Sequence, residues 1–459
     1  MKPGILLLAF AAAAFAQLSD DVRKRVDQVV EKALADTAIP SASIAIVTGG
    51  RISYEHAYGL ARLDPKLPAA PAMRYKIGSN SKQITSTAIL LLVAEGKLSL
   101  DDRVSKYFPD LTRARDVTIR ELLSHQSGYQ DYYAIDFTPP FMTQPTTAAH
   151  ILDTWARKPL DFEPGSQYQY SNTNYVIAGL ILEKVAGQPL MTFLRANVFE
   201  PLDMKSPVDL DHEPWPASEP AGYTRFALGP MRPAIPEGPG WLMAAGELAM
   251  TAADLARWDV SLMNGTILKP SQLKELTTEV PFSTGSGARY GLGVSVGSNN
   301  GKRIWSHTGG VSGFNSSNYV YPDDHISITV LTNGEGPAHS QIVRKLQPIL
   351  LPSATDPDEA RDHDRALVIF TGLQQGKLDR SLLTEDASAY FTAQAVADFA
   401  ASLKPLGKPA SFTQSSVSHR GGMTYRVYSA KARGKTLSIQ LYLMPDGKID
   451  QYLVRPQAQ

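Results

Sequence analysis

A serine and a lysine three residues apart, Ser79 and Lys82, follow an extended segment at 75–78 and open a long apolar segment. Residues three apart on a helix share a face, so the hydroxyl and the amine are expected to lie side by side. The N–H groups at a helix start favour negative charge, which stabilises an alkoxide and an oxyanion. Burial can keep a lysine neutral enough to take the serine proton, or the lysine can act through its charge alone. The pattern predicts a nucleophilic serine.

Two later motifs contain groups that would complete such a site. Tyr170-Ser171-Asn172 offers a phenol that can relay a proton between the serine and a leaving group. Asn172 can hold a substrate amide or steady the lysine. Trp305-Ser306-His307 is predicted to end a strand, and Thr308-Gly309-Gly310 follows it. Glycine there allows a substrate backbone to approach closely, and the Gly310 N–H is a candidate second donor to an oxyanion.

Each motif alone has a simpler interpretation. Ser271 and Lys274 have the same spacing as Ser79 and Lys82, but they follow Pro270 in a charged stretch, so we interpret the serine there as a helix cap. A lone tyrosine such as Tyr170 is usually a packed aromatic, and a lone histidine such as His307 usually makes structural hydrogen bonds. The order of the three motifs along one chain is what favours catalysis by Ser79.

Other histidines give weaker signals. His125, in Leu122-Leu123-Ser124-His125-Gln126-Ser127-Gly128, is predicted to anchor a loop rather than to act as a general base. Asp209-Leu210-Asp211-His212 is a tight acidic cluster with a histidine, but the sequence has no cysteine and no His-x-x-x-His pair. We therefore expect neither a metal site nor a cofactor.

Composition restricts the partners. The 459 residues carry 45 basic and 45 acidic side chains, so no net charge favours nucleic acid, and a small-molecule or peptide substrate is expected. Residues 1–16 have a lysine, an apolar run and Ala14-Phe15-Ala16, which predicts a cleaved signal peptide. We expect a periplasmic or secreted protein without stable membrane insertion after cleavage. Because cysteine is absent, its stability must come from core packing without disulfides.

The elements that must position these motifs form an α/β (α+β) pattern. An amphipathic helix is predicted at 19–36, followed by a hairpin of strands at 43–47 and 52–58. A second set of strands is expected at 291–296, 303–307, 318–321 and 326–331. Between the two sets lies a helical region, including a buried helix from about Ser79 to Gly96. Antiparallel strands from both ends can form one sheet flanked by helices, with a helical subdomain.

The composition changes near residue 352, so we predict a catalytic domain at 17–352, a linker at 353–364 and a small α+β domain at 365–459. The last segment is expected to hold a helix at 387–403 and strands at 437–443 and 449–454. It contains no recognisable pair of nucleophile and base. We interpret it as an accessory packing or docking domain.

The motifs together resemble the serine β-lactamase and penicillin-binding protein family, in its class C-like and DD-peptidase-like branch. The resemblance covers about residues 20–350 and rests on the three motifs, on 95–102, 122–128 and 163–165, and on their order. It implies Ser79 as nucleophile, Lys82 and Tyr170 as acid and base, Asn172 as a substrate contact, and the Ser79 and Gly310 amides as oxyanion donors. It also implies that His307, Thr308 and Gly309 form the wall of the substrate pocket.

The sequence differs from the family's usual pattern at two places that bear on the substrate. Efficient class C β-lactamases carry lysine at the position of His307, and histidine is mostly neutral at neutral pH. Residues 245–251 replace a turn that is richer in glycine and serine in the family. If His307 contacts a substrate carboxylate, binding should strengthen below pH of about 6.5. We therefore expect hydrolysis of amide or ester bonds in peptide-like substrates through an acyl-enzyme on Ser79. An esterase, or a non-catalytic penicillin- or peptide-binding protein, is the alternative.

Overall fold

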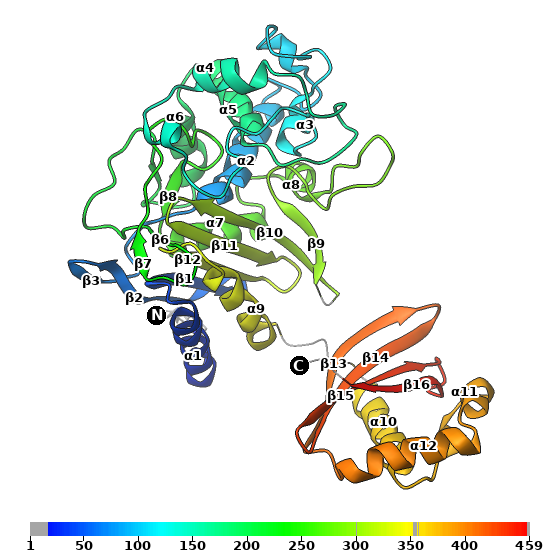
Figure 1. Cartoon of the computed structure of the whole chain (residues 1–459). Coiled ribbons are helices and arrows are strands. Elements are labelled where there is room, and N and C mark those ends of the chain that lie inside the picture. Colours follow the sequence, from blue (N-terminus) through cyan, green and yellow to red (C-terminus); the bar gives the residue numbers. More distant parts are fainter. Residues whose placement is uncertain (1–16, 300, 352–355, 357, 457–459) are drawn as a thin grey trace, which may run out of the picture. The chain divides into compact units, whose positions relative to one another are not determined.

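The computed structural model describes residues 17–299, 301–351, 356 and 358–456, and its chain divides between Leu351 and Pro352 into two compact units (Figure 1). The predicted signal peptide at 1–16 lies outside the described residues. No single helix in the described ranges is long and apolar enough to cross a bilayer. Only a pair bent by 70°, Asn172–Ala186 with Leu190–Phe199, passes that test jointly.

A seven-stranded antiparallel sheet forms the centre of the first unit. Its strand order is β3-β2-β1-β12-β11-β10-β9. The pairing of β1 with β12 joins the two ends of the unit in sequence, with Ile44 opposite Val330. The strands are β1 (Ser41–Thr48), β2 (Arg51–Leu63), β3 (Lys66–Pro68), β9 (Ser295–Asn299), β10 (Lys302–Val311), β11 (Phe314–Tyr321) and β12 (Ile326–Thr332). The predicted antiparallel sheet from both sets of strands is confirmed.

Helices cover both faces of this sheet. On one face, α1 (Asp20–Thr37) and α9 (Ala338–Leu350) bury apolar residues at helical spacing, such as Val26, Val30 and Ala33 on α1. Ser19 caps α1 by accepting a hydrogen bond from the Val22 N–H, which explains where the predicted helix begins. On the other face, α7 (Ala252–Asn264) packs on β1 and β12.

A helical subdomain next to the sheet holds the first two motifs (Figure 1). Its central helix α2 (Ser81–Ala94) packs on α5 (Asn172–Ala186) and α8 (Pro270–Thr277), and α3 (Ile119–Leu123) packs on α5. Eleven of the fourteen residues of α2 are buried, as its apolar sequence predicts. A small sheet, β4 (Tyr75–Lys76), β8 (Leu248–Met250) and β5 (Val208–Asp209), leads the chain into α2. Shorter elements are α4 (Ala148–Ile151), α6 (Leu190–Leu194), β6 (Tyr223–Arg225) and β7 (Met231–Pro233).

The second unit has its own apolar core between one antiparallel sheet and its helices. The sheet order is β13-β14-β15-β16, with strands β13 (Ser411–Arg420), β14 (Met423–Ala432), β15 (Lys435–Leu443) and β16 (Ile449–Pro456). The helices are α10 (Glu359–Gln374), α11 (Glu385–Tyr390) and α12 (Ala393–Leu403). Alternate residues of β15 face the core, so the predicted α+β fold of this segment is confirmed.

Several predicted boundaries are wrong. The strand expected to end at His307 continues to Val311, and the strand expected from 318 begins at Phe314. The strand expected at 291–296 begins at Ser295, because residues 291–294 form a turn in which Gly293 has φ +78°. The helix expected at 387–403 is two helices, since Thr392 caps a new start by accepting from the Ala395 N–H. The linker expected at 353–364 is shorter, because α10 begins at Glu359.

Candidate active site

Ser79 lies in a single 3₁₀ turn, Gly78–Asn80, directly before α2. The turn is held to the sheet through Gly78, whose φ is +53° and where a β-carbon would lie 2.8 Å from the Gly310 nitrogen on β10. Ser81 Oγ donates to the Gly78 carbonyl at 2.8 Å, which fixes the first turn of the helix. The amide groups of Ser79 and Gly310 are therefore brought close together beside the serine hydroxyl.

Lys82 points at Ser79 from inside the protein. Its Nζ donates to Ser79 Oγ at 3.1 Å, to Asn172 Oδ1 at 2.8 Å and to the Ala245 carbonyl at 2.6 Å. Burial lowers the lysine pKa to about 7, against the attraction of the Asp131 and Glu247 carboxylates. A substantial fraction of this amine is thus neutral near pH 7, as proton transfer from the serine requires.

Asn172 is fixed by a carboxylate that the sequence did not single out. Asp131 Oδ1 accepts from the Asn172 backbone N–H at 2.9 Å and from its Nδ2 at 3.2 Å. This contact orients the amide so that its oxygen faces Lys82. Of the two roles considered for Asn172, the structure therefore contains the contact to the lysine. Asp131 could not be identified from a motif, because its importance depends on a contact 41 residues along the chain.

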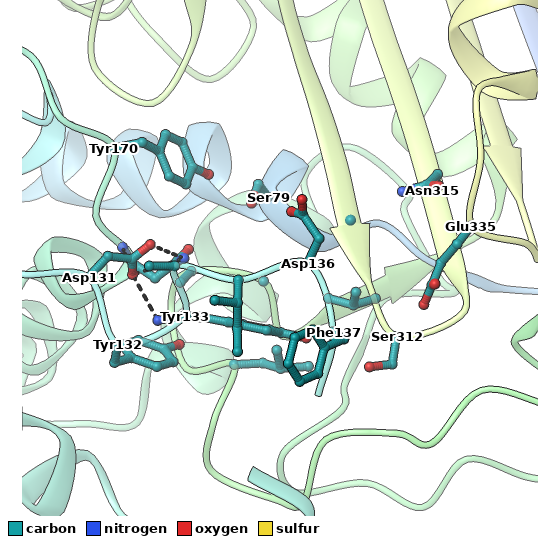
Figure 2. A pocket seen from close by; sticks show the side chains of 18 of the residues that line it. Ser79, Asp131, Tyr132, Tyr133, Asp136, Phe137, Tyr170, Ser312, Asn315 and Glu335 are labelled. Atoms are coloured by element: carbon teal, nitrogen blue, oxygen red, sulfur yellow. Dashed lines mark hydrogen bonds between the residues drawn. The ribbon is translucent and has the colours of Figure 1, made fainter. Parts of the chain in front are cut away.

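Tyr170 lines the same cavity as Ser79, and its hydroxyl is directed toward Ser79 (Figure 2). Lys82 Nζ is 4.9 Å from the centre of its ring. The hydroxyl is buried and has no well-aligned hydrogen-bond partner among the described groups. Burial raises the pKa of Tyr170 well above its usual value, and the Ser79 hydroxyl opposes that shift. Tyr170 is therefore a neutral phenol.

His125 supports the segment that carries Tyr170. The Ser171 N–H donates to His125 Nδ1 at 3.1 Å, and the two rings of His125 and Tyr170 lie 4.2 Å apart. Burial and the nearby Lys82 lower the His125 pKa well below 6.5. These contacts agree with the predicted role as a loop anchor.

Strand β10 presents only part of its motif to the cavity. Gly310 lines the cavity with Ser79, but His307, Thr308 and Gly309 are not among the residues that line it. Gly309 instead faces η1, the turn that carries Ser79, where a β-carbon would lie 1.9 Å from the Ile77 carbonyl oxygen. Because Gly309 has no side chain, β10 can pack closely on that turn.

His307 differs from the expectation of a carboxylate contact. It is buried, its Nε2 is 2.8 Å from the Tyr290 hydroxyl and its Nδ1 is 2.5 Å from the Thr308 carbonyl oxygen. The carbonyl requires a proton on Nδ1, so Tyr290 donates to Nε2. Burial and Lys82 lower the His307 pKa to about 4. The expected rise in affinity below pH of about 6.5 does not follow from this arrangement, because the imidazole stays neutral there.

The cavity beside Ser79 has a volume of about 1070 Å³. One wall is the segment 130–137, which contributes aromatic and acidic side chains (Figure 2). The opposite wall is formed by 310–312, Asn315 and Glu335. The path of the segment 130–137 could not be predicted from the sequence, because it depends on tertiary contacts. In one of them the Tyr133 hydroxyl donates to Glu237 Oε1 at 2.8 Å.

The other candidate motifs lie apart from this chemistry. Ser271 and Lys274 are exposed on α8, which begins one residue earlier, at Pro270. Asp209 accepts from His212 at 2.8 Å within a local turn. Asp211 accepts from the Gly240 N–H at 2.9 Å and so ties this turn to a distant segment. In the part of the chain that the structure describes, no group of three or more potential ligands is arranged to hold a metal ion.

Several known proteins are similar to this chain in sequence. Protein flp of Staphylococcus aureus (strain NCTC 8325 / PS 47) is 27% identical over 336 residues, which is 72% of this chain and 66% of that protein. A D-aminopeptidase of Brucella anthropi is 28% identical over 316 residues, covering 68% of this chain and 59% of that protein. The match thus spans 66% of the first relative and 59% of the second, less than two thirds of either.

Solved structures extend the comparison. The D-amino acid amidase from Ochrobactrum anthropi SV3 complexed with D-phenylalanine has a TM-score of 0.65 at 25% identity, over 72% of this chain and 98% of that one. The octameric penicillin-binding protein homologue from Pyrococcus abyssi has a TM-score of 0.63 at 21% identity, over 94% of this chain and 100% of that one, which shows a shared fold. The sequence model of the family described as Beta-lactamase matches residues 26–349. Its motifs, fold and sequence therefore place this chain in the beta-lactamase family, which includes the penicillin-binding protein homologues.

Proposed function

We propose that this protein is a serine hydrolase that forms an acyl-enzyme on Ser79 and transfers the acyl group to water. The observation that carries the proposal is the buried Lys82 amine, 3.1 Å from Ser79 Oγ and with its pKa lowered to about 7. A lysine in this state can accept the serine proton near neutral pH. Ser79, Tyr170 and Gly310 line one cavity, and Lys82 contacts Ser79 from inside the protein. This arrangement supports the same reaction.

In the acylation step, the neutral Lys82 amine takes the proton of Ser79 while Oγ bonds to the carbonyl carbon of the substrate. The carbonyl oxygen becomes an oxyanion, for which the Ser79 and Gly310 N–H groups are the candidate donors. When the tetrahedral intermediate collapses, the bond to the leaving group breaks and the ammonium of Lys82 returns its proton to that group. Water repeats the sequence on the ester and releases the acid.

Tyr170 is assigned the transfer of the proton rather than its removal. Its raised pKa keeps the phenol protonated, whereas the lowered pKa of Lys82 supplies the base. A phenol directed at Ser79 can receive a proton from one side as it donates to the leaving group on the other. Asn172 and Asp131 hold the lysine in place and do not exchange protons in this scheme.

Peptide-like amides and esters are the proposed substrates. The family supports hydrolysis, and its relatives include a D-aminopeptidase and a D-amino acid amidase. An esterase of the same fold would use the same acyl-enzyme and differ only in the leaving group. His307, which is neutral and already hydrogen-bonded, gives no support to a site for a substrate carboxylate.

Intact-mass spectrometry tests the mechanism. The mature protein and its Ser79→Ala variant would each be exposed to a penicillin and to a p-nitrophenyl ester. We expect an acyl adduct on the wild type with at least one reagent, and no adduct on the variant. Rapid loss of the adduct with release of acid supports a hydrolase, and a lasting adduct without turnover indicates a binding protein. Turnover by Ser79→Ala would overturn the assignment of the nucleophile.

We also propose that the protein is exported to the periplasm or the medium after loss of residues 1–16. The proposal rests on the charged start, the apolar run and the small residues at Ala14 and Ala16. N-terminal sequencing of the secreted protein from a bacterial host should give Gln17 as the first residue. Retention of Met1 in a cytoplasmic fraction would contradict export.

A further inference from the structure

The cavity beside Ser79 is unusually one-sided in charge. Four carboxylate residues line it, and no lysine or arginine occurs among its described lining residues. The four are Asp131, Asp136, Asp161 and Glu335. A cleft lined by charges of one sign raises the local concentration of ligands of the opposite sign.

Three of these carboxylates have protein partners. Asp131 accepts from Asn172, Asp161 accepts from Gln169, and Glu335 accepts from the Gly313 N–H at 2.9 Å. Asp136 is different, because it is exposed and has no hydrogen bond or ion pair to any described residue. Figure 2 shows its carboxylate above the cavity, on the side of Ser79.

None of the described ion pairs involves Asp136, and none of the described residues that line the cavity with it is a lysine or an arginine. The three N–H bonds of the Lys82 ammonium are directed at Ser79, Asn172 and the Ala245 carbonyl, so none points toward Asp136. A further carboxylate, Glu237, lies behind the wall and accepts from the Ser312 N–H at 2.9 Å. His307 is neutral, so it adds no positive charge next to the cavity.

Apolar side chains flank the free carboxylate. Ile135 is 44% exposed and Phe137 is 63% exposed, and both line the cavity next to Asp136. The Tyr170 hydroxyl, buried and without a partner, opens on the same space. The cavity thus combines a place for a reacting carbonyl, an apolar surface and an unneutralised anion.

We infer that the active site selects acyl donors whose acyl part carries a protonated amine, which pairs with Asp136, and disfavours acyl parts that carry a carboxylate. The inference rests on the proposed function, because it assigns a substrate class to the cleft of Ser79. The amine would lie between the Asp136 carboxylate and the apolar side chains of 135 and 137. An anionic acyl part would meet Asp136 and Glu335 without a compensating cation.

Three p-nitrophenyl esters of similar length test this selectivity: the cationic 6-aminohexanoate, the neutral heptanoate and the anionic adipate. In low-salt buffer we expect the wild type to acylate fastest with the first and slowest with the last. An ion pair at a partly exposed site corresponds to a preference of about fivefold in kcat/KM. The preference should shrink as salt is added, because the charges lie partly in solvent.

Asp136→Asn should reduce the ratio of the rates with the cationic and the neutral ester to near one. Asp136→Lys should favour the adipate ester. Asp153→Asn is the matched control, because it removes one surface carboxylate outside the cavity, one paired with Arg157. Equal rates with all three esters, with acylation on Ser79 intact, would overturn the inference alone. No Ser79-dependent acylation by any ester would count against the proposed function itself.

Discussion

At the scale of single residues, the protonation state of Lys82 controls the proposed chemistry. Its pKa of about 7 means that the amine is mainly protonated below pH 7 and mainly neutral above it. Because only the neutral amine accepts the serine proton, kcat/KM for a neutral ester should rise tenfold per pH unit below about 7 and level off above it. Stopped-flow measurement between pH 5 and 9 would check this. A profile that is flat, or that falls through pH 7, would contradict Lys82 as the base.

Asp131 provides a second prediction at this scale, because it orients Asn172 and also attracts the lysine proton. Asp131→Asn should remove the charge that raises the Lys82 pKa, so the rising limb of the profile should move to lower pH. Loosened geometry should lower kcat by up to about 100-fold. If Asp131 only supported the structure, the substitution would lower the rate without changing the pH range in which kcat/KM rises. Asp153→Asn, which is outside the cavity, should do neither.

Residue types and spacing were enough to indicate Ser79, Lys82 and Tyr170, because each must occur at a fixed place in a local motif. The role of His307 was not accessible in this way. Its neutrality depends on burial by the assembled sheet and on the nearby Lys82. Its Nε2 contact is with Tyr290, 17 residues earlier. Asp136 could not be identified from the sequence either, because only the cavity that it lines distinguishes it from other exposed aspartates.

At the scale of elements, the contact between β10 and the turn of Ser79 determines the site. A β-carbon at Gly309 would lie 1.9 Å from the Ile77 carbonyl oxygen and 2.4 Å from Ser316 Oγ. Gly309→Ala should therefore push β10 away from the turn, lower the free energy of unfolding by about 1–3 kcal/mol and reduce acylation. Urea unfolding and ester hydrolysis would measure both effects.

Gly297 offers a matched control on the neighbouring strand β9, since nothing lies within 4 Å of a β-carbon there and its φ is not positive. Gly297→Ala should leave both stability and activity near those of the wild type. If Gly309→Ala proved as stable and as active as this control, the close approach of β10 would not be what positions the Gly310 amide.

Elements with strong periodicity were predicted well, and those that end through tertiary contacts were not. The predicted helix at 19–36 matches α1 within one residue at each end, because Ser19 provides a local cap. The turn at 291–294 was missed because its cause is distant: a β-carbon at Gly291 would lie 2.3 Å from the Leu276 carbonyl oxygen. The break before α12 had a local signal in Thr392, a cap residue that was overlooked within an apolar run.

At the scale of the whole molecule, the order of motifs along the chain predicted the family and the main sheet, because that sheet requires strands from both ends of one long segment. The separate fold of the C-terminal unit followed from its own alternating strands. The boundary of this unit was harder to predict from the sequence. The polar residues at 359–364 are typical both of a linker and of the exposed start of a helix.

Two separate cores lead to a last prediction, on how the molecule unfolds. The core of the second unit is built only from residues between 366 and 454. Next to it Arg426 is buried and donates to Asp362 at 2.8 Å, where both side chains are 2% exposed. Arg426→Gln would remove the buried cation of Asp362 and leave only Arg361, whose side chain is 45% exposed, as its ion-pair partner among the described residues. The loss is expected to cost up to about 3–5 kcal/mol.

Calorimetry of Arg426→Gln should therefore show the transition of residues 352–459 moved to lower temperature or lost, with the transition of the first unit retained. The rate of Ser79 acylation should match that of the wild type, because Ser79, Lys82, Tyr170 and Gly310 all belong to the first unit. Arg455→Gln, which changes an exposed arginine of β16, should alter neither transition. If Arg426→Gln also slowed acylation in proportion to the loss of the second unit, that unit would be part of the functioning active site rather than an independently folded accessory domain.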